Sequence, residues 1–223
     1  MAVCAVTGAS GYVGSRISAA LVAAGWEVRP LGRATGFRLG EVPDLDGVDA
    51  LVHAAWDFSA RTQAEIERTN VEGSKRVLEA ACGRRIVFVS TLSAFPGARS
   101  LYGQAKLAVE EAARAAGGAV IRPGLVWSEE GGSLYASLRK LARLPLLPTF
   151  TDRKLHPAHV DDVAALVGRL LDEPCTGEPI VAAARQPLTL SQILRAANPR
   201  LRIVPVPWRL VWAPLRALEL AGL

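Results

Sequence analysis

Short apolar runs alternate with longer segments of helical pattern through the first half of the chain. The longer segments expected as helices are Ile17–Ala24, Thr62–Cys82 and Leu101–Ala116. Buried strands that alternate with helices are typical of a parallel sheet covered on both faces, so the pattern predicts an α/β, doubly wound fold. The expected strands are Val3–Val6, Val28–Leu31, Ala50–His53, Ile86–Val89 and Ala119–Ile121.

The pattern changes after Pro123 into shorter pieces. A loop at 129–132 precedes an expected helix from Ser133 to Leu144, which Pro145 ends. Asp161 and Asp162 are expected to cap a helix that runs to about Leu171. A helix over Leu190–Ala197 and a strand over Leu201–Val204 follow. We therefore expect a core over residues 1–125, with 126–223 completing the sheet and forming a small substrate lobe in one domain.

The last stretch, Trp208–Leu223, is apolar and carries Arg209, Arg216 and Glu219. An amphipathic helix packed on the body is the expected structure. Two alternatives stay open from the sequence, namely contact with a membrane interface and a truncated element.

A glycine-rich turn follows the first strand and opens the first helix. Its spacing is Gly8-x-x-Gly11-x-x-Gly14. Glycines let the backbone approach a ligand closely, and a helix N-terminus offers N–H groups and positive dipole to an anion. The turn therefore predicts a phosphate cradle for a dinucleotide cofactor.

Composition narrows the class of protein. The chain has 223 residues and is 50% hydrophobic, which suits one α/β domain. No apolar run reaches about 18 residues and no secretory signal is visible. The three cysteines, Cys4, Cys82 and Cys175, are far apart, which fits a cytoplasmic protein without disulfides or a metal site.

The net charge of +5 comes without a basic run interleaved with aromatics, which argues against nucleic-acid binding. The charge favours an anionic cofactor or substrate through its field, or reflects genome composition. The sequence leaves both explanations open.

Three stretches carry candidate chemistry. Tyr102 and Lys106 are four residues apart in an expected helix and so share a face, where an ammonium lowers the pKa of a phenol. Ser90 and Thr91 end an apolar strand and can bond a substrate oxygen or form a turn. Asn70 lies inside a helical pattern, where it can bond a neighbouring strand or hold a water molecule.

Together these stretches resemble the short-chain dehydrogenase/reductase superfamily, in its extended epimerase/dehydratase branch. The resemblance covers about residues 2 to 165, and its motifs come in the family's order. The matching stretches are Thr7–Gly14, His53–Ala55, Asn70–Ser74, Ser90–Thr91, Tyr102–Lys106, Arg122–Pro123 and His159–Asp162.

The resemblance implies a Rossmann-type fold and hydride transfer between a nicotinamide cofactor and a secondary alcohol or ketone. It makes Tyr102 the general acid/base, Lys106 the residue that holds the ribose, and Thr91 the residue that bonds the substrate oxygen. Ser90 would sit behind Thr91. The expected cofactor contacts are Gly8, Ser10, Gly11, Tyr12, Val13, Gly14, Arg33, Ala54, Ala55, Tyr102, Lys106 and Pro123.

Arg33 follows the second strand, where an acidic residue would bind the ribose of NAD and an arginine suits the 2′-phosphate of NADP. Arg29 and Arg38 are near it in sequence, and no Asp or Glu lies between Arg29 and Gly40. The sequence therefore predicts NADP rather than NAD.

The chain departs from the family's motifs at two places, and these departures narrow the reactions that we expect. Dehydratases of this branch follow the threonine with Asp-Glu, whereas Leu92 and Ser93 stand here, so we expect no dehydratase activity. Leu125 replaces the asparagine that touches the diphosphate in many sugar-nucleotide enzymes.

We expect a small-molecule substrate and a reductase or an epimerase reaction. We also expect two copies to pair through the helices at 62–82 and 101–116. A non-catalytic NADP-binding sensor or scaffold is the alternative function.

Overall fold

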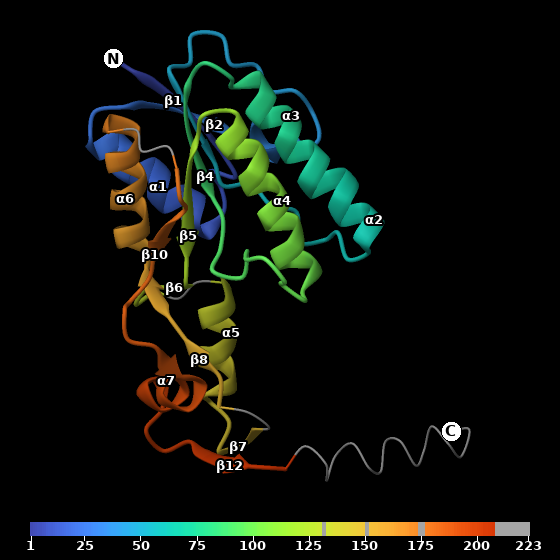
Figure 1. The fold of residues 1–223 in the computed structure, drawn as a ribbon. Helices are drawn as coiled ribbons and strands as arrows, with labels where there is room; N and C mark the ends of the chain where they lie inside the picture. The colour runs from blue at the N-terminus through green and yellow to red at the C-terminus, as the bar shows by residue number, and fades with distance from the viewer. Residues whose placement is uncertain (131–132, 150–151, 174–176, 208–223) are drawn as a thin grey trace.

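The computed structural model describes residues 1–130, 133–149, 152–173 and 177–207, and its centre is a parallel sheet (Figure 1). The six strands lie in the order β10-β5-β4-β3-β1-β2, and every pairing is parallel. The α/β, Rossmann-type prediction is confirmed. The strands are β1 (Val3–Thr7), β2 (Glu27–Leu31), β3 (Ala50–His53), β4 (Arg85–Val89), β5 (Ala119–Pro123) and β10 (Ile180–Ala182).

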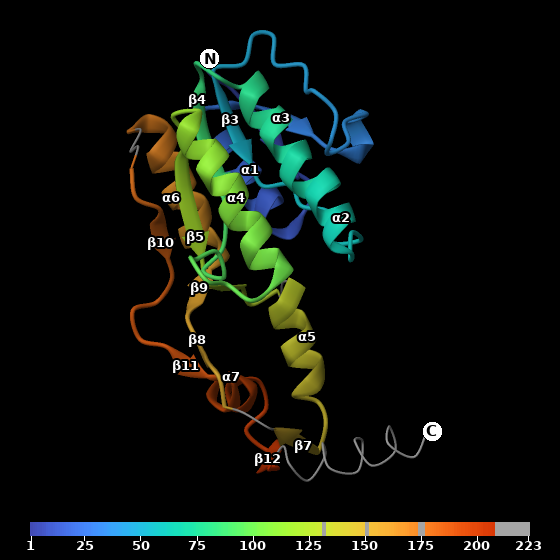
Figure 2. The same ribbon diagram turned by 45° about the vertical axis from the view of Figure 1, so that its right-hand side comes forward.

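Helices cover both faces of the sheet (Figures 1 and 2). One face carries α1 (Tyr12–Ala23) and α6 (Val160–Asp172), and the other carries α3 (Glu72–Ala80) and α4 (Leu101–Ala115). Successive strand residues point to opposite faces, because the side chains of a strand alternate. Val52 accordingly packs in the α1/α6 core, whereas Leu51 packs in the α3/α4 core.

The helical segment predicted at 62–82 is not uniform. It begins with α2 (Gln63–Glu65), continues as the π-helix η2 (Ile66–Val71) and passes into α3. Thr62 caps α2 by accepting a hydrogen bond from the backbone N–H of Glu65. A short 3₁₀-helix, η1 (Arg33–Thr35), follows β2.

A small lobe extends beyond one end of the sheet (Figure 1). It has its own apolar core, separate from the two cores of the sheet. Two short strands, β6 (Leu125–Trp127) and β9 (Pro157–His159), pair where the lobe joins the sheet. The lobe contains α5 (Ser133–Leu141), β7 (Leu146–Thr149), β8 (Lys154–Leu155), β11 (Leu188–Thr189), α7 (Leu190–Ala197) and β12 (Arg202–Pro205).

Two sequence predictions need correction. The helix expected to reach Leu144 ends at Leu141, and a turn leads from there to Pro145. The cap of α6 is His159, whose ring accepts a hydrogen bond from the N–H of Asp161; both predicted capping aspartates lie within the first turn instead.

The predicted tail structure at 208–223 and Cys175 lie outside the described residues. Within the described ranges, no helix combines the length and apolar character needed to cross a bilayer. The pairing of two copies through α3 and α4 stays a prediction.

Candidate functional site

The glycine turn packs too tightly for side chains. Gly8 has φ +71°, and a Cβ built on it would lie 2.9 Å from the backbone N of Ala55. A Cβ on Gly14 would lie 2.1 Å from the carbonyl oxygen of Gly8. Among the described residues, no side chain caps α1 at Gly11 and no acidic residue stands in its first turn. The N–H groups at this helix end therefore suit an anion such as a pyrophosphate.

Thr7 and His53 join the ends of β1 and β3 beneath this turn. The Thr7 Oγ1 accepts hydrogen bonds from the N–H groups of Ala54 and Ala55, each at 3.2 Å. Because both of its lone pairs are used, the hydroxyl donates to His53 Nδ1 at 2.7 Å. These bonds hold Ala54 and Ala55 against Gly8.

The remaining residues predicted to contact the cofactor at the glycine turn differ in exposure and in their contacts. Ser10 is exposed, and Val13 packs at the margin of the α1/α6 core. The hydroxyl of Tyr12 donates to Ser128 Oγ at 2.8 Å. Tyr12 therefore links the turn to the segment that follows β6.

Arg33 is exposed at the start of η1, beyond the end of β2. It lies near Asp57, whose pKa is lowered first by hydrogen bonds from Ser59 and to a smaller extent by Arg33. Arg29 donates instead to the carbonyl oxygen of Asp46 at 2.8 Å. Arg33 is therefore better placed than Arg29 to meet a ligand at the glycine turn.

The structure brings the side chains of Tyr102 and Thr91 close enough for Thr91 to affect the pKa of the phenol. Burial raises the pKa of Tyr102, and the interaction with Thr91 partly offsets the rise. The sequence expectation of a lowered Tyr102 pKa is wrong in this structure. The neighbouring ammonium is itself deeply buried and so carries its charge less readily.

Lys106 is 3% exposed, and its Nζ donates to the carbonyl oxygen of Val89 at 2.9 Å. Its Nζ also lies 4.4 Å from the ring centroid of Trp56 and 4.7 Å from that of Phe88. Burial lowers the pKa of Lys106 to about 7, against a smaller raising effect of Glu110. An amine in this range can change its protonation near neutral pH.

Glu110 is a site residue that the sequence reasoning missed. It lies one turn beyond Lys106 on α4, is 2% exposed, and accepts from the hydroxyl of Ser90. Arg122 donates to both of its oxygens, through Nε at 2.9 Å and Nη2 at 2.6 Å. Ser90 is therefore held by Glu110 rather than free to meet a ligand. The i+4 spacing from Lys106 is the signal that was present in the sequence.

Two aromatic rings near Tyr102 were also missed. Trp56 meets it edge-on with ring centroids 5.3 Å apart, and Phe58 is stacked at 6.2 Å. Asn70 fixes the loop that carries both, accepting from the N–H of Asp57 at 2.7 Å and donating to its carbonyl oxygen at 3.0 Å. Asn70 therefore bonds the loop after β3 rather than a neighbouring strand.

These residues gather at the carboxyl ends of the strands. Trp56 directly follows Ala55, which packs on Gly8, so contacts run continuously from the glycine turn to Tyr102 and Lys106. Pro123 ends β5 and accepts a hydrogen bond from Leu92 at 3.0 Å. Ligands of open α/β sheets bind at this edge.

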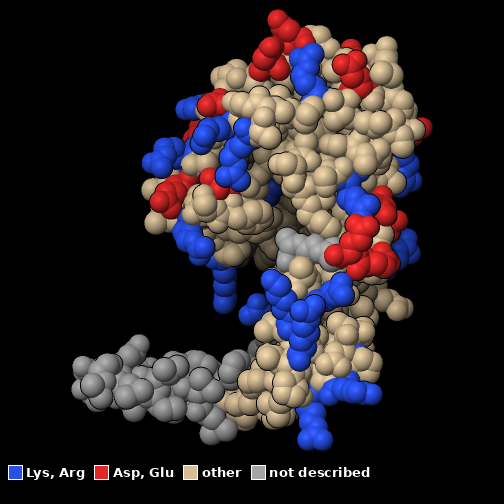
Figure 3. All heavy atoms as spheres, turned by 180° about the vertical axis from the view of Figure 1, so that it is seen from behind, with Lys and Arg blue, Asp and Glu red and all other residues tan. Residues whose placement is uncertain are grey.

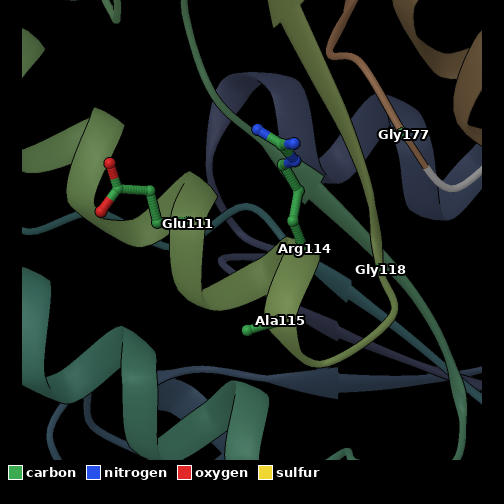
Figure 4. A pocket seen from close by; sticks show the side chains of 5 residues that line it. All are labelled: Glu111, Arg114, Ala115, Gly118 and Gly177. Carbon is green, nitrogen blue, oxygen red and sulfur yellow. The ribbon is translucent and has the colours of Figure 1, made fainter.

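A hollow of about 510 Å³ lies elsewhere, between Glu111, Arg114 and Ala115 of α4, Gly118 and Gly177 (Figure 4). Gly118 immediately precedes β5, so this hollow is at the amino ends of the strands. It lies at the opposite end of the sheet from Tyr102 and plays no part in the candidate site.

Comparisons with known proteins show the family of the chain. A protein-family model described as the RmlD substrate binding domain matches residues 2–183. A ceramide reductase of Caulobacter vibrioides is 30% identical over an alignment of 236 positions, which covers 92% of this chain and 74% of that protein.

Two further matches differ in extent. A 4-hydroxy-2-methyl-3-oxo-4-farnesyl-3,4-dihydroquinoline-1-oxide ketoreductase of Stigmatella aurantiaca is 41% identical over an alignment of 118 positions, which covers 43% of this chain and 35% of that protein. The crystal structure of a dTDP-4-dehydrorhamnose reductase of Clostridium acetobutylicum matches with a TM-score of 0.78 at 19% identity, covering 92% of this chain and 84% of that one. The latter likeness concerns the fold alone.

Proposed function

Because the chain belongs to the RmlD substrate binding domain family, within the extended short-chain dehydrogenase/reductases, we propose that it is an NADP-dependent reductase of a ketone. The observation that carries the proposal is the placement of Tyr102 beside Thr91 and one helical turn from the buried Lys106. A phenol, a hydroxyl and an amine at the carboxyl edge of the sheet supply the groups that a carbonyl reduction needs.

The residues present fit a nicotinamide dinucleotide. Gly8 and Gly14 leave the backbone bare at the uncapped start of α1, and this arrangement suits a pyrophosphate. Arg33 supports the phosphorylated form, because guanidinium pairs well with phosphate. When bound, the cofactor supplies the hydride that becomes attached to the carbonyl carbon.

The chain's own residues handle the proton. Tyr102 donates its phenolic proton to the carbonyl oxygen, which becomes the alcohol. Thr91, whose side chain lies near Tyr102, holds that oxygen in place. Lys106 packs on the same Trp56 ring as Tyr102, and its protonated form favours the phenolate that remains. Glu110 anchors this side of α4 to Arg122.

The relatives favour a reductase over an epimerase and suggest a lipophilic substrate. The two named above are a ceramide reductase and a ketoreductase of a farnesylated quinoline oxide, and both substrates carry long hydrocarbon chains. The apolar rings of Trp56 and Phe58 beside Tyr102 are compatible with such a chain. We infer that the substrate is an amphipathic ketone.

The Tyr102→Phe variant tests the mechanism. We expect NADPH oxidation over a panel of ketones, from 2-butanone to long-chain ketones in mild detergent, to fall about a hundredfold or more, because the proton donor is lost. NADPH binding, followed by its fluorescence, should be retained and serves as the internal control. Unchanged turnover in the variant contradicts the role of Tyr102. A wild-type protein that binds NADPH but oxidises it with no ketone of the panel favours the sensor or scaffold function.

The Arg33→Ala variant tests the cofactor form. We expect the wild type to bind NADPH more tightly than NADH, and the variant to lose about tenfold in NADPH affinity with little change for NADH. Arg29→Ala is the matched control, because Arg29 lies on β2, just before Arg33, but bonds the carbonyl oxygen of Asp46. Equal or tighter NADH binding by the wild type contradicts the assignment.

A further inference from the structure

The net positive charge of the chain is concentrated in the small lobe. Residues 133–155 and 185–207 carry nine Lys and Arg and a single acidic residue, Asp152, whereas the rest of the chain has 17 basic and 20 acidic residues. The space-filling view shows blue side chains over this lobe without red among them (Figure 3). The basic residues are Arg139, Lys140, Arg143, Arg153, Lys154, Arg185, Arg195, Arg200 and Arg202.

Exposed apolar side chains lie among these charges at the end of the lobe farthest from the sheet. Leu141, Leu144 and Leu146 are 42%, 44% and 49% exposed as α5 turns into β7 (Figure 1). Arg143 stands in that turn, and the parallel pairing of β7 with β12 sets Arg202 beside Leu146. Basic and apolar side chains are therefore interleaved on one surface, formed by the α5–β7 turn and β12.

We propose that this surface docks on an anionic lipid membrane. Anionic headgroups attract Lys and Arg that lie within a Debye length, and exposed leucines become buried at the boundary of headgroups and acyl chains. The basic residues of the lobe supply the electrostatic attraction, and the leucines of the α5–β7 turn supply the apolar burial.

A nucleic acid or a second copy of the chain fits this surface less well. Bases stack on aromatic side chains, and Tyr135 is the single aromatic in the described part of the lobe, where it packs on Trp127. Two copies of a surface with nine basic residues and one acidic residue would repel each other. Exposed leucines beside arginines match a lipid surface better than either partner.

Sedimentation of the full chain with vesicles tests the proposal and does not depend on the reductase activity. We expect binding to phosphatidylglycerol-containing vesicles, weakened by salt, and little binding to pure phosphatidylcholine. The Arg143→Glu/Arg202→Glu variant should lower the partition coefficient about tenfold or more. The matched control, Arg114→Glu/Arg169→Glu, makes the same charge change on α4 and α6 and should bind as the wild type does.

A third variant, Leu144→Ser/Leu146→Ser, keeps every charge and should also weaken binding. Circular dichroism and NADPH binding show that each variant is folded. The proposal is overturned if the control loses as much binding as the lobe variant, or if neutral vesicles bind equally well. Tighter binding to a DNA oligonucleotide, or loss of vesicle binding only when residues 208–223 are removed, also overturns it.

Discussion

At the scale of single residues, His53 combines a structural role with a cost. It is fully buried, stacks on Phe88 and receives the hydrogen bond of Thr7 at Nδ1, which leaves the ring hydrogen on a buried Nε2 without a partner among the described residues. Burial lowers the pKa of His53 from 6.5 to about 3, and Lys106 adds a smaller lowering. The imidazole therefore stays neutral under conditions in which an exposed histidine would be protonated.

This shift predicts acid sensitivity. Between pH 6.5 and about 3 the unfolded chain binds a proton at His53 that the folded chain does not, so the free energy of unfolding falls as pH falls through this window. The contribution is of the order of a few kcal/mol. Urea unfolding at a series of pH values should show this slope, and His53→Asn should flatten it.

His156→Asn is the control for that measurement, since His156 is a partly exposed histidine that bonds the carbonyl oxygen of Ala184. It should keep the slope of the wild type. A His53→Asn protein with the full wild-type slope would show that other groups cause the acid sensitivity.

At the scale of elements, local pattern predicted the strands and helices that bury continuous apolar runs. The bounds of β3 and α7 agree with the prediction, and α4 differs by one residue. The sequence predicted that residues 126–223 complete the sheet, but it did not locate the sixth strand, β10, because its three residues are half-exposed at the sheet edge and are defined by pairing with β5. Pairing between distant segments leaves no local period in the sequence.

The π-helical turn η2 shows a second limit of local pattern. Its backbone departs from the α-helix where Asn70 forms two hydrogen bonds with the backbone of Asp57, a contact between distant segments. Hydrophobic spacing carries no signal for such a contact.

Some residues of the candidate site could likewise be predicted from local pattern, and others could not. Motif spacing indicated Tyr102, Lys106 and Thr91. The reaction needs a phenol and an amine on one face of a helix and a hydroxyl at the end of a strand, and these requirements leave a pattern in the sequence. Trp56 and Glu110 emerged only when the loop after β3 and strand β5 were in place. The lowered pKa of Lys106 likewise follows from burial by these neighbours, which the sequence alone could not give.

At the scale of the whole molecule, the sheet and the lobe have separate apolar cores. The sheet and its helices enclose two apolar clusters beneath the glycine turn, while the lobe has a separate cluster built from α5, α7 and the start of β12. Stability need not be uniform over such a structure, because a segment with a separate core can open locally. Cofactor binding and contacts made by the lobe should therefore respond to different substitutions.

Leu194→Ala and Leu51→Ala test this division. Both leucines are buried, Leu194 in the lobe and Leu51 in β3, and each substitution should cost about 2–5 kcal/mol in its own core. Leu194→Ala should increase hydrogen exchange in α5 and α7 and leave NADPH affinity near that of the wild type. Leu51→Ala should lower the melting temperature of the sheet and weaken NADPH binding. Equal loss of NADPH affinity in both variants would mean that the cores unfold as one unit.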